Sequence, residues 1–326
     1  MTRSLLFDFS NNYWAKSYQE VQTMNNCVKY VPLKYAPHVV GMIGGMSVHS
    51  SQSMEKIIQR VFNDILGELH SADLITWTVN FHYIRQHMLN GNWDYLAEEM
   101  SRLAGSLVKI GATKVAIASN TMHQTAPQVI NAIGEDHFIH IADCAAAQCR
   151  QIGIKRVLFL GTKESMEGNF IRERLERHGL TFYVPYDAME EIDEIIFDHL
   201  CHDVVQAEDL EFLAGHVLPE YIEEYNIEGV ILGCTELSML INERNCGRRL
   251  GAIAGYRNGI LPFVDSMTEH ARGIVKACLG LDPLLPNLDV DVAFRKLERA
   301  EKNTLAHSIV SVSNSNYGTT PKPYSF

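Results

Sequence analysis

The sequence lacks long apolar runs, closely spaced cysteines and any excess of positive charge. No apolar stretch approaches the roughly 20 residues that a membrane helix needs, so no membrane partner is predicted. The 28 Lys and Arg residues are scattered and outnumbered by 39 Asp and Glu residues, which gives a net charge of -11. Because nucleic-acid binding needs a basic surface, this balance argues against a nucleic-acid partner.

The cysteines and the N-terminus bear on where the protein is expected to reside. The first residues contain no long apolar core followed by a small-residue cleavage site, as a secretion signal would. The seven cysteines are an odd, widely spaced set. Both features predict a cytoplasmic protein with reduced thiols. Six cysteines are interpreted as small buried hydrophobic residues, namely Cys27, Cys144, Cys149, Cys201, Cys246 and Cys278.

Motifs for nucleotides and metals are also missing. The segment GMIGGMS at residues 41–47 fits neither GxGxxG nor GxxxxGK[ST], so nucleotide binding is rejected. We interpret it as a tight turn that lets backbone approach a ligand and places Met46 and Ser47 on the floor of a cleft. Two histidine pairs, at 137/140 and 199/202, have no further ligands nearby in the sequence. No metal site is therefore predicted.

Apolar runs that suit buried parallel strands alternate with helical patterns over residues 38–280. The helix expected at 95–110 carries Leu96, Met100, Leu103 and Leu107 on one face. Strands are expected at 39–43, 73–81, 114–118, 156–160, 181–184 and 229–232. This alternation predicts an α/β protein with parallel sheets.

An internal repeat organises these elements. VGMIG at 40–44 matches VLFLG at 157–161, and VAIASNT at 115–121 matches VILGCTE at 230–236. Gly44 and Ser119 lie 75 positions apart, and Gly161 and Cys234 lie 73 apart. We infer an internal duplication that gives two similar domains. Ligands of parallel sheets bind beyond the carboxyl ends of the strands, so Ser119 and Cys234 are expected to face one interdomain cleft from opposite sides.

Chemistry is expected at these two strand ends. A thiol has a pKa of about 8.5 and can act as acid or base, and backbone N–H groups of a following helix would favour the thiolate of Cys234. On the other side, Asn120 and Thr121 suit a carboxylate or an ammonium group, and Ser119 or Asn120 could also cap the next helix. His123 either supports the residues of this site without contacting the ligand or is a packed core residue.

Taken together, these residues resemble the aspartate/glutamate racemase superfamily. The resemblance spans about residues 38–280 and rests on motifs in the family's order: GMIGGMS, VNFHYIRQ, SNTMH, HIAD, LGTKESMEGNFIRERL and LGCTEL. It implies two Rossmann-like domains related by a pseudo-twofold axis, no pyridoxal phosphate or other cofactor, no metal, and a homodimer. It also implies that the last helix, near 266–279, returns to the first domain. The expected parts are an N-terminal extension at 1–37, a first domain at 38–150 with 256–282, a second domain at 151–255, and a partly disordered tail at 283–326.

The sequence departs from the family at the first strand end. Most such racemases carry a cysteine at both strand ends, so that acid and base act on opposite faces of a planar carbanion, and some carry threonine at the first. Here the first position is Ser119, and a serine hydroxyl is a poor base unless it is activated. Racemisation with strong asymmetry between enantiomers is the leading hypothesis. The alternatives are a single-cysteine decarboxylase of the arylmalonate type and an inactive amino-acid-binding relative.

The side chain of the substrate is left open. Aspartate-specific relatives hold the distal carboxylate with an arginine after the second strand, where Arg85 stands, and with a lysine near the position of Glu190 and Glu191. The acidic residues would favour a neutral or cationic side chain instead. The hypothesis assigns catalysis to Cys234 and Ser119, with His123 or water assisting the serine. Substrate binding is assigned to Met46, Ser47, Arg85, Asn120, Thr121, Thr162, Thr235 and Glu236.

Overall fold

The computed structural model describes residues 38–67, 69–202, 204–241 and 261–297. The expected N-terminal extension, the end of the expected C-terminal tail, and Cys27 and Cys246 lie outside these residues. None of the helices in the described part of the chain is long and apolar enough to cross a membrane.

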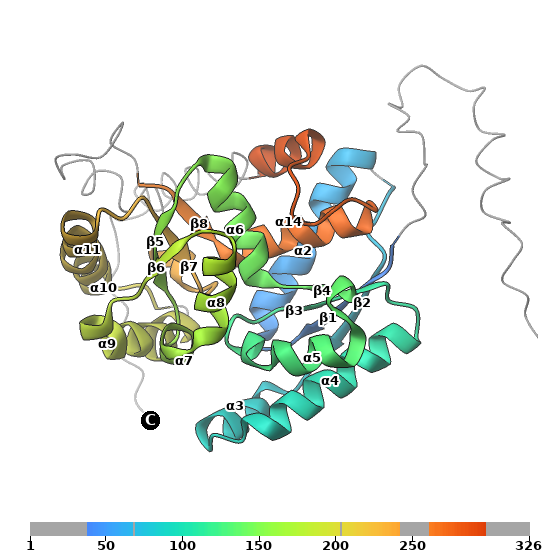
Figure 1. The fold of residues 1–326 in the computed structure, drawn as a ribbon, viewed down its shortest axis with the longest axis horizontal. Helices are drawn as coiled ribbons and strands as arrows, with labels where there is room; N and C mark the ends of the chain where they lie inside the picture. Colours follow the sequence, from blue (N-terminus) through green and yellow to red (C-terminus); the bar gives the residue numbers. More distant parts are fainter. Residues whose placement is uncertain (1–37, 68, 203, 242–260, 298–326) are drawn as a thin grey trace, which may run out of the picture. The chain divides into compact units, whose positions relative to one another are not determined.

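Two parallel sheets form the frame of the molecule (Figure 1). The first has the order β2-β1-β3-β4 and the second the order β6-β5-β7-β8, so the two halves share one topology. The predicted α/β class with parallel sheets is confirmed. The strands are β1 (Val40–Gly44), β2 (Leu74–Thr78), β3 (Lys114–Ile117), β4 (Phe138–Ile139), β5 (Arg156–Leu160), β6 (Thr181–Tyr183), β7 (Gly229–Leu232) and β8 (Phe263–Asp265).

Helices link the strands, as parallel pairing requires. The α-helices are α2 (Val48–Leu66), α3 (Phe81–Leu89), α4 (Trp93–Lys109), α5 (Ala126–Ile133), α6 (Ile141–Ile152), α7 (Lys163–Glu167), α8 (Asn169–Arg177), α9 (Met189–Glu194), α10 (Ala207–Glu211), α11 (Leu218–Tyr225), α12 (Leu237–Leu240) and α14 (Ser266–Cys278). Short 3₁₀ turns are η1 (Thr121–Thr125), η2 (Glu135–His137), η3 (Tyr186–Ala188) and η5 (Leu200–His202), and π-helical turns are η4 (Ile195–His199) and η6 (Phe212–Val217).

Alternating side chains of the first sheet fill two separate cores. Val40 and Met42 of β1 pack against the side of α2 and α14, whereas Ile43 packs against α3 and α4. The predicted apolar face of α4 is confirmed, since Leu96 and Met100 have no exposed surface. Each face of this sheet is therefore covered by helices, as is usual for a parallel sheet.

The end of the described chain connects the two sheets. Strand β8 pairs with β7 in the second sheet, and α14 follows it at once and packs against α2 and α6 (Figure 1). Within the region expected to be a partly disordered tail, residues 288–297 are helical. Phe294 of this helix is fully buried, and the Arg272 guanidinium lies 4.3 Å from the centre of its ring. This helix is therefore part of the core that lies between the first sheet and helices α2 and α14.

Replacing Phe294 with alanine is expected to lower the free energy of unfolding by roughly 3–5 kcal/mol, because a large buried ring is lost. The measurement is urea denaturation followed by circular dichroism. Leu288→Ala, on the same helix but 73% exposed, serves as the control and should change stability by less than about 0.5 kcal/mol. Equal effects of the two substitutions would contradict the packing of this helix on the core.

Candidate functional site

A cavity of about 70 Å³ lies where the strand ends of both sheets meet. Each half contributes side chains to its wall, as expected for a ligand site of parallel sheets. Nine residues of the sequence-based assignment line it: Met46, Ser47, Ser119, Asn120, Thr121, Thr162, Cys234, Thr235 and Glu236. Arg85 and His123 are not among the described lining residues.

The turn after β1 forms one edge of the cavity. Gly45 has a φ of 98°, and a side chain there would collide with the backbone oxygen of Val79. Its N–H donates to the Ser51 hydroxyl at 2.8 Å, and the Ser47 hydroxyl caps α2 by accepting from the N–H of Ser50 at 3.3 Å. The glycine thus lets the chain turn sharply and brings Met46 and Ser47 to the cavity.

The end of β3 is held by hydrogen bonds that reach the other half. The Asn120 side chain donates to the Ser266 hydroxyl at 2.9 Å, and Ser266 donates in turn to the carbonyl oxygen of Leu232 at 2.7 Å. The Thr121 hydroxyl lies 3.0 Å from that of Thr162. The end of β3 is thus linked to that of β7 through Ser266, and to that of β5 through the two threonines.

Cys234 follows β7 at the equivalent place in the second sheet. Gly233 must precede it without a side chain, since a Cβ there would lie 2.0 Å from the Phe159 ring. The Cys234 thiol donates to the Glu236 carboxylate at 3.0 Å, and the Thr235 hydroxyl donates to the same oxygen at 2.5 Å. The carboxylate of Glu236 therefore collects two donors beside the cavity.

The charge state of this thiol differs from the sequence-based expectation. Burial, and then the negative charge of Glu236, raise the pKa of Cys234 well above its usual value. The following helix α12 has only four residues, and the backbone N–H of Glu236 favours the thiolate by less than burial and the carboxylate oppose it. In the unliganded protein Cys234 is thus a protonated thiol, which suits a proton donor.

His123 supports the backbone of the serine rather than its hydroxyl. Its Nδ1–H donates to the carbonyl oxygen of Ser119 at 2.7 Å, and its Nε2 accepts from the N–H of Ile141 at 3.1 Å. Both ring nitrogens are occupied, so the histidine is neutral and has none left for the Ser119 hydroxyl. The expected assistance of the hydroxyl by His123 finds no support in this geometry.

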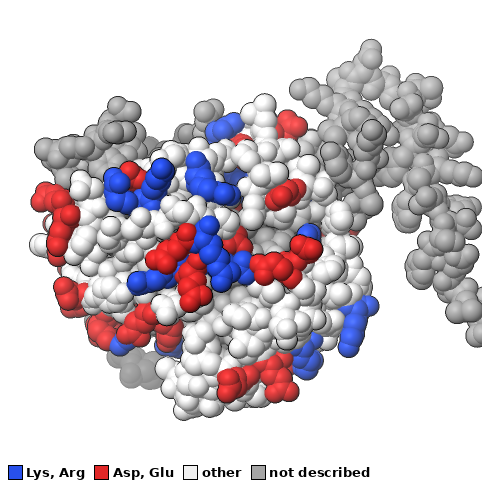
Figure 2. All heavy atoms as spheres, viewed as in Figure 1, with Lys and Arg blue, Asp and Glu red and all other residues white. Residues whose placement is uncertain are grey.

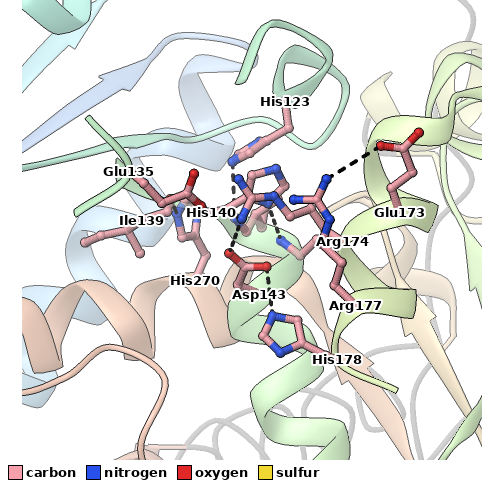
Figure 3. A network of polar contacts seen from close by, with 12 residues as sticks. His123, Glu135, Ile139, His140, Asp143, Glu173, Arg174, Arg177, His178 and His270 are labelled. Carbon is pink, nitrogen blue, oxygen red and sulfur yellow. Dashed lines mark hydrogen bonds and ion pairs between the residues drawn. The ribbon is translucent and has the colours of Figure 1, made fainter. Parts of the chain in front are cut away.

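Two further histidines are buried beside His123 (Figure 3). The rings of His140 and His270 lie 4.5 Å and 5.8 Å from that of His123. Burial lowers the pKa of His123 to about 3 and that of His270 to about 4, and lowers that of His140 as well. All three rings are therefore neutral at neutral pH.

An ionic network next to these rings joins α6 and α8 (Figure 3). The Asp143 carboxylate lies 3.1 Å from Arg174 and 2.9 Å from His178, and Arg174 also pairs with Glu135 at 2.6 Å. On the face shown in Figure 2, acidic and basic side chains are interspersed rather than gathered by sign. The structure describes no group of three or more His, Cys, Asp or Glu residues that could hold a metal.

The residues assigned to the distal end of a substrate are not among the described lining residues of the cavity. Glu190 and Glu191 are exposed, and Glu190 forms an ion pair with Lys163. Neither carboxylate is among the described lining residues of the cavity, so their effect on a substrate stays a prediction. Arg85 stacks on the ring of Phe197, with its guanidinium carbon 3.8 Å from the ring centre.

Sequence reasoning missed several lining residues. The interpretation of Cys201 as a buried hydrophobic residue is wrong, because it is exposed and lines the cavity; Cys144, Cys149 and Cys278 are buried as expected. Phe81 and Met88 are seven positions apart, a spacing that places two apolar residues on one helix face and could have indicated a second wall of the cavity. The missed residues are Ser50, Met54, Phe81, Met88, Ala118, Met122, Ile141, Ile196, Phe197, Cys201, Gly233 and Met267.

Comparison with known proteins assigns the chain to a family. The model of the Asp/Glu/hydantoin racemase family matches residues 43–274. The chain therefore belongs to this family, and the resemblance found in the sequence is confirmed.

Solved structures extend this comparison. A candidate Asp/Glu racemase from Yersinia pestis is 32% identical, with a TM-score of 0.65 over 74% of this chain and 99% of its own. An aspartate racemase homologue from Pyrococcus horikoshii OT3 is 27% identical, with a TM-score of 0.61 over 73% and 98%. The aspartate racemase of Picrophilus torridus, 18% identical, shares the fold with a TM-score of 0.54 over 74% and 94%.

The state of the Cys234 thiol can be tested by alkylation with iodoacetamide in a Cys201→Ser background. We expect the rate at Cys234 to keep rising up to about pH 9, because only the thiolate reacts. Glu236→Gln removes a charge that raises the pKa, so it should speed the reaction about tenfold for each pKa unit lost. Peptide mass spectrometry gives the rates. Glu190→Gln is the control and should have no effect, whereas a plateau below pH 8 would contradict a raised pKa.

The buried histidines predict a loss of stability in mild acid. Their pKa values are lower in the folded than in the unfolded protein, so the unfolded state gains protons below about pH 6.5. Each histidine should cost about 2 kcal/mol between pH 7 and pH 5. His270→Gln should show a loss smaller by that amount in urea titrations at the two pH values.

The comparison between variants isolates His270 from other titrating groups. The buried carboxyl of Asp265, whose pKa is raised to about 6 by burial, acts in the opposite direction in both proteins. An identical pH dependence of wild type and His270→Gln would show that His270 is not held neutral in the folded protein.

Proposed function

We propose that this protein is a cofactor-independent amino-acid racemase that moves a proton at the α-carbon of a free amino acid. The observation that carries the proposal is the position of the Cys234 thiol, 3.0 Å from the Glu236 carboxylate, in a cavity that Ser119 also lines. Inversion of a stereocentre requires a proton to leave one face of a carbon and another to arrive on the opposite face. Groups from two facing strand ends suit this requirement.

The thiol and the carboxylate supply one half of the reaction. When Cys234 delivers a proton to a planar carbanion, its thiolate forms and the new C–H bond is made. In the reverse direction the thiol first gives its proton to Glu236, and the thiolate then removes the α-proton. Since the thiol is protonated at rest, proton delivery by Cys234 is the easier of the two steps.

Ser119 provides the other face in this proposal. Among the described residues, its hydroxyl accepts one long contact of 3.4 Å, from the N–H of Met122, which leaves it able to bind a water molecule or a substrate. A hydroxyl is a far weaker base than a thiolate at neutral pH. The two enantiomers should therefore react at very different rates.

Polar groups around these two residues suit the common part of an amino acid. The hydroxyls of Thr121, Thr162 and Thr235 and the amide of Asn120 can bind the α-carboxylate. Glu236 is the charged group placed to attract the ammonium. In this proposal the reaction uses no pyridoxal phosphate, because the thiol itself transfers the proton.

A second candidate is a single-cysteine decarboxylase that protonates the carbanion left by loss of carbon dioxide. Two observations favour it: the raised pKa of Cys234, and a lining that contains five methionines and two phenylalanines. Loss of carbon dioxide needs one proton donor and an apolar cavity rather than two opposed bases. An amino-acid-binding relative without turnover ranks third, because binding alone has no use for the thiol.

Exchange of the α-proton with deuterium from the solvent tests the proposal. Both enantiomers of an amino-acid panel should exchange in deuterium oxide, one faster than the other, as followed by proton magnetic resonance. Cys234→Ala should reduce exchange by roughly 10²–10⁴-fold, the usual contribution of one acid–base group. Cys278→Ala removes a buried thiol outside the cavity lining and should retain exchange.

Three outcomes separate the candidates. Unchanged exchange in Cys234→Ala would refute the role of the thiol. Release of carbon dioxide from substituted malonates without amino-acid exchange would establish the decarboxylase. Stereospecific binding with neither reaction would identify the protein as a binder.

A further inference from the structure

Part of the cavity wall is built from apolar side chains of two elements. Phe81 and Met88 come from α3, and Ile196 and Phe197 come from the π-helical turn η4. Among the described lining residues, Glu236 is the one with a charged side chain. A carboxylate on the substrate would thus meet one negative charge and no positive charge from these residues.

A cation beside this part of the wall stacks on an aromatic ring. Arg85 lies on α3 between Phe81 and Met88, and its guanidinium carbon is 3.8 Å from the centre of the Phe197 ring. Its Nη1 is buried and finds no hydrogen-bond partner among the residues that the structure describes. Phe197 lines the cavity and Arg85 does not, so the ring screens the guanidinium from the cavity.

We infer that the site takes amino acids with a neutral, apolar side chain, and that Phe197 sets this preference by screening Arg85. The inference rests on the proposed function for its reaction. Apolar side chains of a substrate are stabilised by contact with the methionines and phenylalanines, and the flexible methionines adapt well to straight chains. An acidic side chain would have to lose its hydration without a partner charge, which is strongly unfavourable.

The stacking on Phe197 also offsets part of the free-energy cost of burying the Arg85 side chain. A buried N–H without a partner is normally unfavourable, and stacking on the ring of Phe197 offsets part of this cost through a cation–π interaction. The same unpartnered N–H would bind a carboxylate strongly if the ring were removed. Residue 197 therefore determines whether the cation takes part in binding.

The experiment compares norvaline, whose side chain is an apolar propyl group, with aspartate, whose side chain of similar size ends in a charged carboxylate. In the wild-type protein we expect kcat/KM for α-proton exchange to be at least about tenfold higher with norvaline. Phe197→Ala should raise kcat/KM for aspartate about tenfold and lower that for norvaline. The double variant Phe197→Ala/Arg85→Met should lose the gain with aspartate, and Phe197→Leu, which keeps an apolar screen, should show no such gain.

Binding to the same proteins, measured by calorimetry, keeps this result separate from the proposed function. If no amino acid exchanges, the proposed function fails, and tighter binding of norvaline than of aspartate still supports the inference. Faster exchange or tighter binding of aspartate in the wild-type protein would overturn it. Equal or undetectable binding of both compounds would also overturn it, as would a gain with aspartate that persists in the double variant.

Discussion

A single buried hydroxyl, that of Ser266, holds the two strand ends of the site together. It accepts a hydrogen bond from Asn120 after β3 and donates one to the carbonyl oxygen of Leu232 at the end of β7. Ser266 begins α14, which packs on the helices beside the first sheet. The position of Cys234 relative to Ser119 therefore depends in part on this short chain of hydrogen bonds within the core, where such bonds are costly to break.

The sequence predicted the frame of the molecule well, for a physical reason. Buried parallel strands are continuous apolar runs, and the six expected strands are all present. Strands β4 and β8, of two and three residues, were missed, although β6 is as short as β8 and was predicted. The repeat also located the lining residues at the strand ends, since topology alone brings the carboxyl ends of parallel strands together.

The remaining parts of the site depend on contacts that no local pattern records. Phe197 and Cys201 reach the cavity from a π-helical turn and the short turn that follows it, and the placement of Arg85 behind a ring follows from packing between distant segments. The charge state of Cys234 likewise depends on burial and on Glu236 together. The expectation from the following helix alone was a lowered pKa for this thiol, whereas burial and Glu236 raise it.

The π-helical turn η4 has a consequence for how this cavity can change. A π-turn contains one more residue per turn than ordinary helix, and each α-helical residue advances the direction of side chains by about 100°. Deleting one residue from 195–199 would restore regular helix and swing the following side chains, including Cys201, by about that angle. The shape of the cavity thus depends on helical phase as well as on residue identity. A change in length at this turn would therefore redirect side chains that no substitution at the turn itself would move.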